Sequence, residues 1–475
     1  SGAEPLVTGL CDPVAYPHPA ARVQHIETHI SHLFLAGDYA YKLKKQLDLG
    51  FLDFSTPARR KFFCEEEVRL NRRLAPRVYL GVVPITGTPD APRIGGVGPV
   101  LEYAVKMRRF DQRGLLTGLP LAGDLPERIA ERVADFHQSI PSADPGSEFG
   151  SWEAVLRPMR ANFERVRSLL TDADVLGDLD RLERWTLRRH GALRGVLEGR
   201  KTGGFIRECH GDMHRGNIVV EAGEVLIFDG IEFNPALRWI DTMSELAFLV
   251  MDLEEADETP QARRLLNRYL ELTGDYAGLR VLDLYKVYRA MVRAKVTAIR
   301  LGQADLGADE VRRDRDALHR YLELALGYTR PRHVRLYLTR GLSGSGKSRL
   351  AIALRARLAL IHLRSDIERK RLFALPADAR TRPAGTNQGI YTPEAGRRTY
   401  ARLLELARGV LEAGYSPLVD ATFLRRDQRA PFIALAAEAG AGCTILDLEA
   451  PGPVLRRRVA AREAEARDPS EAGIP

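Results

Sequence analysis

The stretch that decides the fold is His210-Gly211-Asp212-Met213-His214-Arg215-Gly216-Asn217, which runs into the apolar segment Ile218-Val219-Val220. A second apolar segment, Leu226-Ile227-Phe228, ends in Asp229-Gly230. Two carboxylates and a carboxamide therefore flank two short, strand-like segments. One interpretation is a turn and a β-hairpin with ordinary surface polar residues. The joint spacing of the two stretches favours a single site instead.

A histidine, any residue and an aspartate, with an asparagine five positions after the aspartate, repeat the spacing of a kinase catalytic loop, and a strand ending in Asp-Gly repeats the metal-binding segment. The stretch resembles the aminoglycoside phosphotransferase and choline kinase family, which shares the protein-kinase fold. The resemblance covers roughly the first 330 residues. It implies that Asp212 accepts the proton of an attacking hydroxyl, and that Asn217 and Asp229 hold Mg²⁺ against the phosphates of ATP.

Residues 24–45 are predicted to form two strands around Gly37-Asp38, a hairpin signal. In a kinase-like N-lobe the returning strand carries the lysine that holds the α- and β-phosphates. Lys42 and Lys44 both follow an apolar-x-apolar pattern and lie on one face of the strand. The resemblance favours Lys44, because the lysine of that family usually falls just before the strand ends, and Lys42 is the alternative.

A helix is expected over residues 62–74, because apolar positions recur there behind a run of three glutamates. A kinase needs a helix glutamate to pair with the strand lysine. Glu67 is predicted for that role because the apolar positions that follow it would pack the helix on the lobe. The alternative is that these acids are solvated charges near a helix start.

A second motif follows Pro331-Arg332-His333. The apolar run 334–339 leads into a Gly-x4-Gly-Lys-Ser loop, the phosphate-binding loop of a strand–loop–helix unit. The glycines let backbone N–H groups surround phosphates at a helix N-terminus. The residues expected to bind nucleotide here are Gly341, Ser343, Gly344, Ser345, Gly346, Lys347 and Ser348. Lys347 is expected to reach the β- and γ-phosphates and Ser348 to bind Mg²⁺.

The next predicted strand ends at Asp366, with Arg369 three residues on. That arrangement resembles small P-loop kinases of the polynucleotide kinase, gluconate kinase and zeta-toxin type. The resemblance implies that Asp366 activates the acceptor hydroxyl and that Arg369 holds substrate or phosphate. Asp420, at the end of a third strand, is a candidate metal-holding or water-holding carboxylate. Arg458 and Arg462 suit a lid over the transferred phosphate, with a solvated helix as the alternative.

The fold class that these motifs imply is mixed α/β and α+β in two domains. A protein-kinase-like bilobal domain is expected over residues 1–330, with an N-lobe at about 20–105 and a C-lobe at about 106–330. A P-loop NTPase domain with a parallel sheet is expected over residues 331–475. The cofactors expected are ATP and Mg²⁺.

Composition and charge limit the kinds of partner and the cellular location that the sequence allows. The chain has 475 residues, 45% of them hydrophobic and 28% charged. No apolar run approaches the roughly 18 residues of a membrane span, no signal peptide is expected, and four scattered cysteines point to the cytoplasm. From residue 331 onward there are 25 Lys and Arg against 15 Asp and Glu, a net +10, whereas the first 330 residues carry 46 against 48, a net −2.

The function expected first is a bifunctional ATP-dependent phosphotransferase with two separate sites, acting on a small-molecule or nucleotide substrate. The basic C-terminal part leaves a nucleic-acid 5′-end kinase as an alternative, although Arg-rich helices also arise from a GC-rich genome. The third interpretation is a regulatory, toxin–antitoxin-like fusion in which one domain is a nucleotide-binding switch.

Overall fold

The computed structural model describes residues 3–48, 53–303, 306–375 and 392–465. The chain folds into two compact units. The first comprises Ser1–Leu121, Ser139–Ala154 and Arg200–Leu249, and the second comprises Ala122–Gln138, Val155–Gly199 and Val250–Pro475. None of the described helices has the length and apolarity needed to cross a membrane.

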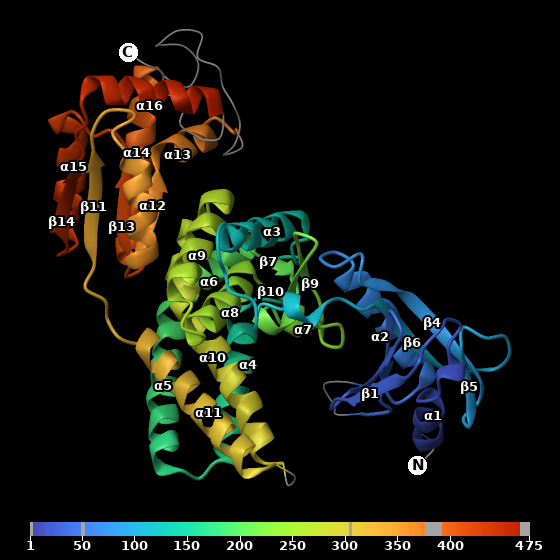
Figure 1. The fold of residues 1–475 in the computed structure, drawn as a ribbon. Helices are drawn as coiled ribbons and strands as arrows, with labels where there is room; N and C mark the ends of the chain where they lie inside the picture. The colour runs from blue at the N-terminus through green and yellow to red at the C-terminus, as the bar shows by residue number, and fades with distance from the viewer. Residues whose placement is uncertain (1–2, 49–52, 304–305, 376–391, 466–475) are drawn as a thin grey trace. The chain divides into compact units, whose positions relative to one another are not determined.

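The first unit contains a six-stranded antiparallel sheet in the order β1-β2-β3-β6-β4-β5, drawn in blue in Figure 1. Its strands are β1 (Val23–Glu27), β2 (Ser31–Ala36), β3 (Tyr39–Lys44), β4 (Tyr79–Thr88), β5 (Ala91–Ile94) and β6 (Val100–Arg108). The predicted hairpin around Gly37-Asp38 is confirmed, because Ala36 pairs with Tyr39. Gly37 has φ +56°, a left-handed conformation that glycine adopts without strain.

Alternation along β3 separates apolar from charged side chains. Tyr41 and Leu43 enter a core cluster with Phe34 of β2. Lys42 and Lys44 therefore project from the opposite face of the strand. Helix α2 (Pro57–Asn71) packs against β4 and β6 of this sheet.

Helix α2 begins five residues before the predicted start. Thr56 caps it, with Oγ1 accepting from the backbone N–H of Arg59 at 3.3 Å, and Pro57 occupies the first helical position. Both are standard start signals of a helix. The helix ends at Asn71 rather than at residue 74.

The stretch around Asp212 folds as a loop followed by a tight hairpin of β8 (Ile218–Glu221) and β9 (Glu224–Ile227). The two turn residues, Ala222 and Gly223, have φ +48° and +81°, as the tight turns of two-residue hairpins require. Ile218 pairs with Ile227, and the Phe228 N–H donates to the Asn217 carbonyl at 3.0 Å. This register brings Asn217 next to the segment that carries Asp229.

The remaining elements assigned wholly to the first unit are α1 (Ala3–Leu10), β7 (Ile206–Glu208), α7 (Pro235–Arg238) and β10 (Trp239–Asp241). Four helices cross a unit boundary: α3 (Leu125–Ser139), α4 (Trp152–Leu169), α6 (Arg194–Thr202) and α8 (Thr242–Glu255). The second unit holds α5 (Ala173–Ala192), α9 (Thr259–Thr273), α10 (Leu279–Leu301) and α11 (Ala308–Tyr328).

The second unit also contains a four-stranded parallel sheet in the order β12-β13-β11-β14, as predicted (Figure 1, orange to red). Its strands are β11 (Arg335–Arg340), β12 (Leu360–Arg364), β13 (Ser416–Asp420) and β14 (Gly442–Asp447). The helices of this part are α12 (Lys347–Arg357), α13 (Ser365–Leu372), α14 (Pro393–Glu412), α15 (Arg426–Glu438) and α16 (Gly452–Glu465). Because parallel strands end at the same edge, the loop after β11 lies beside the ends of β12 and β13.

Candidate active sites

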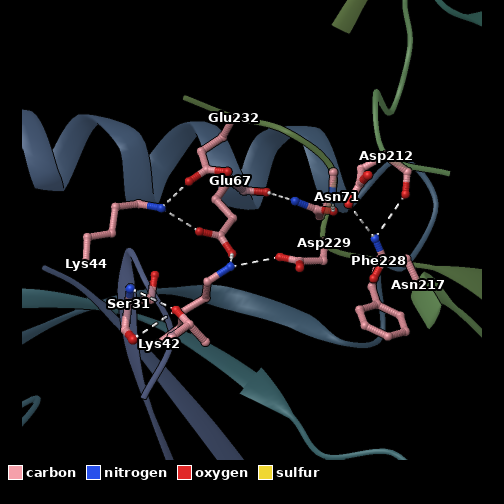
Figure 2. A network of polar contacts seen from close by, with 12 residues as sticks. Ser31, Lys42, Lys44, Glu67, Asn71, Asp212, Asn217, Phe228, Asp229 and Glu232 are labelled. Carbon is pink, nitrogen blue, oxygen red and sulfur yellow. Dashed lines mark hydrogen bonds and ion pairs between the residues drawn. The ribbon is translucent and has the colours of Figure 1, made fainter. Parts of the chain in front are cut away.

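Two lysines of β3 share one glutamate of α2 (Figure 2). Lys42 Nζ lies 2.9 Å from Glu67 Oε1, and Lys44 Nζ lies 2.7 Å from Glu67 Oε2. Each lysine also has its own second carboxylate. Lys42 contacts Asp229 Oδ1 at 2.8 Å, and Lys44 pairs with Glu232. The predicted pairing of Glu67 is therefore present, with both candidate lysines at once.

Burial separates the two lysines. The Lys44 side chain is fully buried, whereas Lys42 is 17% exposed and its partner Asp229 is 50% exposed. Burial alone would lower the pKa of Lys42, but Asp229, Glu67 and Glu232 outweigh it and hold that pKa well above its usual range. Burial likewise opposes ionisation of Glu67, but Lys42 and Lys44 lower its pKa to about 2. Both lysines and Glu67 are therefore charged at neutral pH.

Asp212 and Asn217 lie together in the loop before β8 (Figure 2). Asn217 Nδ2 donates to the Asp212 carbonyl at 3.0 Å and to Asp212 Oδ2 at 3.2 Å. His214 Nε2 lies 3.4 Å from the same carboxylate oxygen. The Asp212 side chain is 35% exposed and Asn217 is buried. The structure thus gives an accessible carboxylate held by a buried amide, which an exposed hairpin with solvated polar residues would not.

His210 supports this loop from inside the protein. Its Nδ1 accepts from the Asp212 N–H at 3.3 Å, so the proton lies on Nε2, which donates to the Phe228 carbonyl at 2.8 Å. Burial lowers the pKa of His210 and keeps the ring neutral. Glu245 of α8 accepts from the backbone N–H groups of His210 and Gly211, at 3.1 and 2.6 Å.

The backbone at Asp229 is left-handed, with φ +60°, an uncommon conformation that needs support from its surroundings. Tyr79 of β4 supplies it, because the Asp229 N–H donates to Tyr79 Oη at 3.0 Å. The next N–H, of Gly230, donates to Asn71 Oδ1 at 2.7 Å. Asn71 belongs to α2, four residues after Glu67, so one helix fixes both the lysines and the Asp229 segment.

The donor set fits a divalent cation with ATP. Asn217 Oδ1 and Asp229 Oδ2 have no hydrogen-bond partner among the described residues, while their sister atoms are held by Asp212 and Lys42. Two uncommitted oxygens of carboxamide and carboxylate type are ligands that Mg²⁺ prefers. Beside them, the Lys42 ammonium is positioned to neutralise phosphate charge.

The second site surrounds the loop between β11 and α12. Gly341, Gly344 and Gly346 have φ of +147°, +83° and +101°. A Cβ at Gly341 would meet the Leu448 carbonyl at 2.4 Å, so only glycine fits there. Gly346 precedes α12 without a side-chain cap, and Ser345 Oγ is buried with no hydrogen-bond partner among the described residues. A helix start without a side-chain cap and a buried, unpaired hydroxyl fit a phosphate group.

The loop lies beside the end of β13, because β11 and β13 are paired parallel strands. Ser348 is the second residue of α12, Asp420 ends β13, and Lys347 Nζ donates to the carbonyls of Gly341 and Leu342, each at 2.9 Å. Asp420 is buried, and burial opposes its ionisation, but His362 and other neighbours lower its pKa below the usual range. Ser348 and Asp420 therefore stand at the same edge of the sheet, and their role in holding Mg²⁺ stays a prediction.

The other predicted residues of this site are placed as follows. Asp366 and Arg369 lie in α13, directly after β12, and Arg369 Nε donates to Thr399 Oγ1 at 3.4 Å. Arg458 of α16 donates to the Gly344 carbonyl at 3.3 Å, so this arginine contacts the phosphate loop. Ser343 is part of the loop itself. Arg462 lies in α16, and its side chain is outside the described residues.

Several residues that contact the predicted site residues do not belong to any sequence motif. They are Asn71, Tyr79, Glu232 and Glu245 in the first unit, and Asn267, Glu271, Thr339, Arg355 and His362 in the second. Only Asn71 had a sequence signal, since it lies four residues after Glu67 on the same helix face. The others reach their sites through long-range packing.

Comparison with known proteins assigns both halves of the chain. The sequence model of the phosphotransferase enzyme family matches residues 51–282, and the model of the AAA domain matches residues 336–474. Uncharacterized protein Rv2004c of Mycobacterium tuberculosis is 32% identical over 469 residues, which cover 96% of this chain and 90% of the relative.

Solved structures of similar proteins were also found. A choline/ethanolamine kinase family protein from Mesorhizobium loti matches 68% of this chain and 98% of its own, with 14% identity and a TM-score of 0.38. An amicoumacin kinase matches 65% of this chain and 90% of its own, with 13% identity and a TM-score of 0.41.

The fold and the family matches define an enzyme of the phosphotransferase class, with an aminoglycoside-phosphotransferase-like kinase domain followed by a P-loop domain. The chain belongs to the same family as the mycobacterial protein Rv2004c. Kinases of these classes use ATP with a divalent metal.

Proposed function

We propose that the protein is a bifunctional kinase that transfers the γ-phosphoryl group of ATP to hydroxyl acceptors at two separate sites. The observation that supports this proposal is that each half of the chain has its own lysine, with carboxylate and neutral oxygens of the kinds that bind Mg²⁺. The first set is Lys42, Asn217, Asp229 and Asp212. The second is Lys347 and Ser348 at the start of α12, Asp420 at the end of β13 and Asp366 directly after β12.

In the kinase-like domain, Lys42 rather than Lys44 holds the α- and β-phosphates. Lys42 contacts the exposed Asp229, whereas Lys44 is fully buried between Glu67 and Glu232. Asn217 and Asp229 hold Mg²⁺ through their uncommitted oxygens. Bound Mg²⁺-ATP supplies the phosphoryl group. Asp212 takes the proton of the acceptor hydroxyl. The hydroxyl oxygen bonds to the γ-phosphorus while the bond between that phosphorus and the ADP oxygen breaks.

In the P-loop domain, the glycine-rich loop and Lys347 bind the phosphates, and Ser348 with Asp420 holds Mg²⁺. Asp366 orients the acceptor hydroxyl and Arg369 holds substrate or phosphate. Arg458 closes over the loop from α16, which its contact with the Gly344 carbonyl supports. The acceptor is a small molecule or a nucleotide. The net +10 of residues 331–475 supports a nucleic-acid 5′-end as the second candidate acceptor.

The test is an acceptor screen with labelled ATP on the full chain and two variants. Asp212→Asn disables the first site and Lys347→Ala the second. Two acceptor classes should appear with the parent chain, and each variant should lose one of them. A chain in which a single substitution abolishes all transfer has one catalytic site, and its other half then acts as a nucleotide-binding switch.

A further inference from the structure

One face of α9 contacts strand β12 and helix α12 of the P-loop domain, although α9 lies in the segment matched by the phosphotransferase family model. Arg263, Asn267 and Glu271 are spaced four residues apart and therefore share this face. Arg263 Nη1 donates to the Arg357 carbonyl, the last residue of α12, at 2.7 Å. The other two residues make contacts that lead to the phosphate site.

Asn267 closes the edge of the parallel sheet. Its Nδ2 donates to the Leu360 carbonyl at 3.0 Å, and its Oδ1 accepts from the His362 N–H at 2.8 Å. Among the described strands β12 lies at one end of the sheet, so in this part of the chain no strand pairs with these backbone groups on that side. The buried carboxamide of Asn267 takes the place of the missing strand and fixes the backbone of His362.

Glu271 fixes the imidazole of the same histidine. It pairs with Arg355 of α12 at 2.6 Å, and both side chains are buried. Arg355 Nη1 lies 3.4 Å from His362 Nδ1. An arginine N–H only donates, so Nδ1 of His362 accepts and the ring proton stands on Nε2. The Glu271–Arg355 pair thereby selects the tautomer of His362.

His362 then orients the carboxylate at the end of β13. Its Nε2 lies 3.1 Å from Asp420 Oδ2, and Thr339 Oγ1 lies 3.3 Å from Asp420 Oδ1. The His362 side chain is fully buried, which excludes water as a substitute donor. These two partners, His362 and Thr339, restrict the rotamer of the Asp420 carboxylate.

We propose that His362 is the positioning residue of the P-loop phosphate site, and that α9 is a structural part of that site through Asn267 and Glu271. The inference rests on the proposed role of Asp420 with Ser348. Occupancy of the P-loop site and the order of α9 are then thermodynamically linked, and the linkage acts in both directions. Nucleotide with Mg²⁺ at the P-loop protects α9, and damage to the α9 contacts weakens Mg²⁺-dependent binding.

The test uses the full chain carrying Asp229→Asn, which weakens the first nucleotide site. ADP affinity is measured with Mg²⁺ and with a chelator, and amide hydrogen exchange is followed over residues 259–273. His362→Leu should reduce the Mg²⁺-dependent gain in affinity about 10–100-fold, the usual loss when a second-layer partner of a metal ligand is removed. Affinity in the chelator should be unchanged, and nucleotide should no longer protect α9.

Three further variants separate positioning from stability. His362→Gln keeps an N–H donor near the Nε2 position and should restore most of the Mg²⁺ effect. Glu271→Gln should give an intermediate loss. Arg263→Ala removes a contact of the same helix face that does not reach Asp420, and should retain the full Mg²⁺ effect.

The outcomes are distinct. A parent chain that binds no ADP overturns the P-loop half of the proposed function. A parent that binds ADP while His362→Leu shows the parental Mg²⁺ dependence overturns this inference alone. An equal loss in Arg263→Ala and His362→Leu also overturns it, because α9 would then serve only to hold the domain in place.

Discussion

Lys42 Nζ lies 2.8 Å from Asp229 Oδ1, a contact between residues 187 positions apart in the chain. The lysine comes from the sheet and the aspartate from the end of the β8–β9 hairpin. Both are in the first compact unit, so the cation and the carboxylate to which we assign phosphate and Mg²⁺ binding lie in direct contact. Under the proposed function, nucleotide with its metal would bind beside this pair and share its charges.

Replacing each of the two lysines of β3 should therefore affect a different property, nucleotide binding for Lys42 and stability for Lys44. Lys42→Met should weaken ATP binding and transfer at the first site, with little loss of stability, because Glu67 keeps Lys44. Lys44→Met should leave Glu232 buried without its partner, at a cost of about 3–5 kcal/mol in the free energy of unfolding. Denaturant unfolding and nucleotide titration, each on both variants, check this; the reverse pattern would assign the phosphates to Lys44.

The two aspartates of the central stretch should separate chemistry from metal binding. In a Lys347→Ala background, Asp212→Asn should keep ATP affinity while transfer falls about 10²–10⁴-fold, the usual contribution of a positioned base. Asp229→Asn should lower both affinity and transfer, since it is placed beside Lys42. Titration calorimetry and single-turnover transfer measure the two effects. Full transfer by Asp212→Asn would remove this residue from the chemistry.

The full chain should bind two nucleotides. Calorimetry with Mg²⁺ and a non-hydrolysable ATP analogue should give a stoichiometry near two, and Lys347→Ala should bring it near one. The physical reason is that Lys347 lies in the P-loop, whereas Lys42 and Asp229 form a separate set in the other unit. Complete loss of binding in Lys347→Ala would contradict two sites.

Stability should fall as the pH drops below about 6.5. Burial lowers the pKa of His210 in the folded protein, so the unfolded chain takes up this proton at a pH where the folded chain does not. One such proton changes the free energy of unfolding by about 1.4 kcal/mol per pH unit. Urea unfolding of the parent and of His210→Asn at pH 5, 6 and 7 checks this. The variant should show a shallower slope; equal slopes would mean that His210 titrates freely.

Local spacing predicted which residues of each motif lie near one another, because each motif is short and its geometry follows from neighbouring backbone. A two-residue hairpin turn brings Asn217 next to the segment that carries Asp229, and Gly341 to Ser348 lead into a helix N-terminus. The choice between Lys42 and Lys44 could not be made from local spacing. The two lysines share a strand face and Glu67, and they differ in that Lys44 is buried and pairs with Glu232, which lies far along the chain.

The supporting residues could not be predicted for the same reason. Glu245 braces His210 across 35 residues, and Asn267 reaches His362 across 95. A buried glutamate or asparagine in a helix carries no sequence pattern that names its partner. The predicted start of α2 was wrong for a different reason. The Thr56-Pro57 helix-start signal was present in the sequence and could have placed the start correctly.

The carboxamide of Asn267 on the rim of β12 has a consequence for how this chain could be divided. A P-loop fragment beginning at residue 331 would expose the backbone of an outer strand that α9 normally covers. Such an uncovered rim is a template for pairing with other copies. Excised on its own, the fragment should self-associate through β12, so its solubility should fall below that of the full chain.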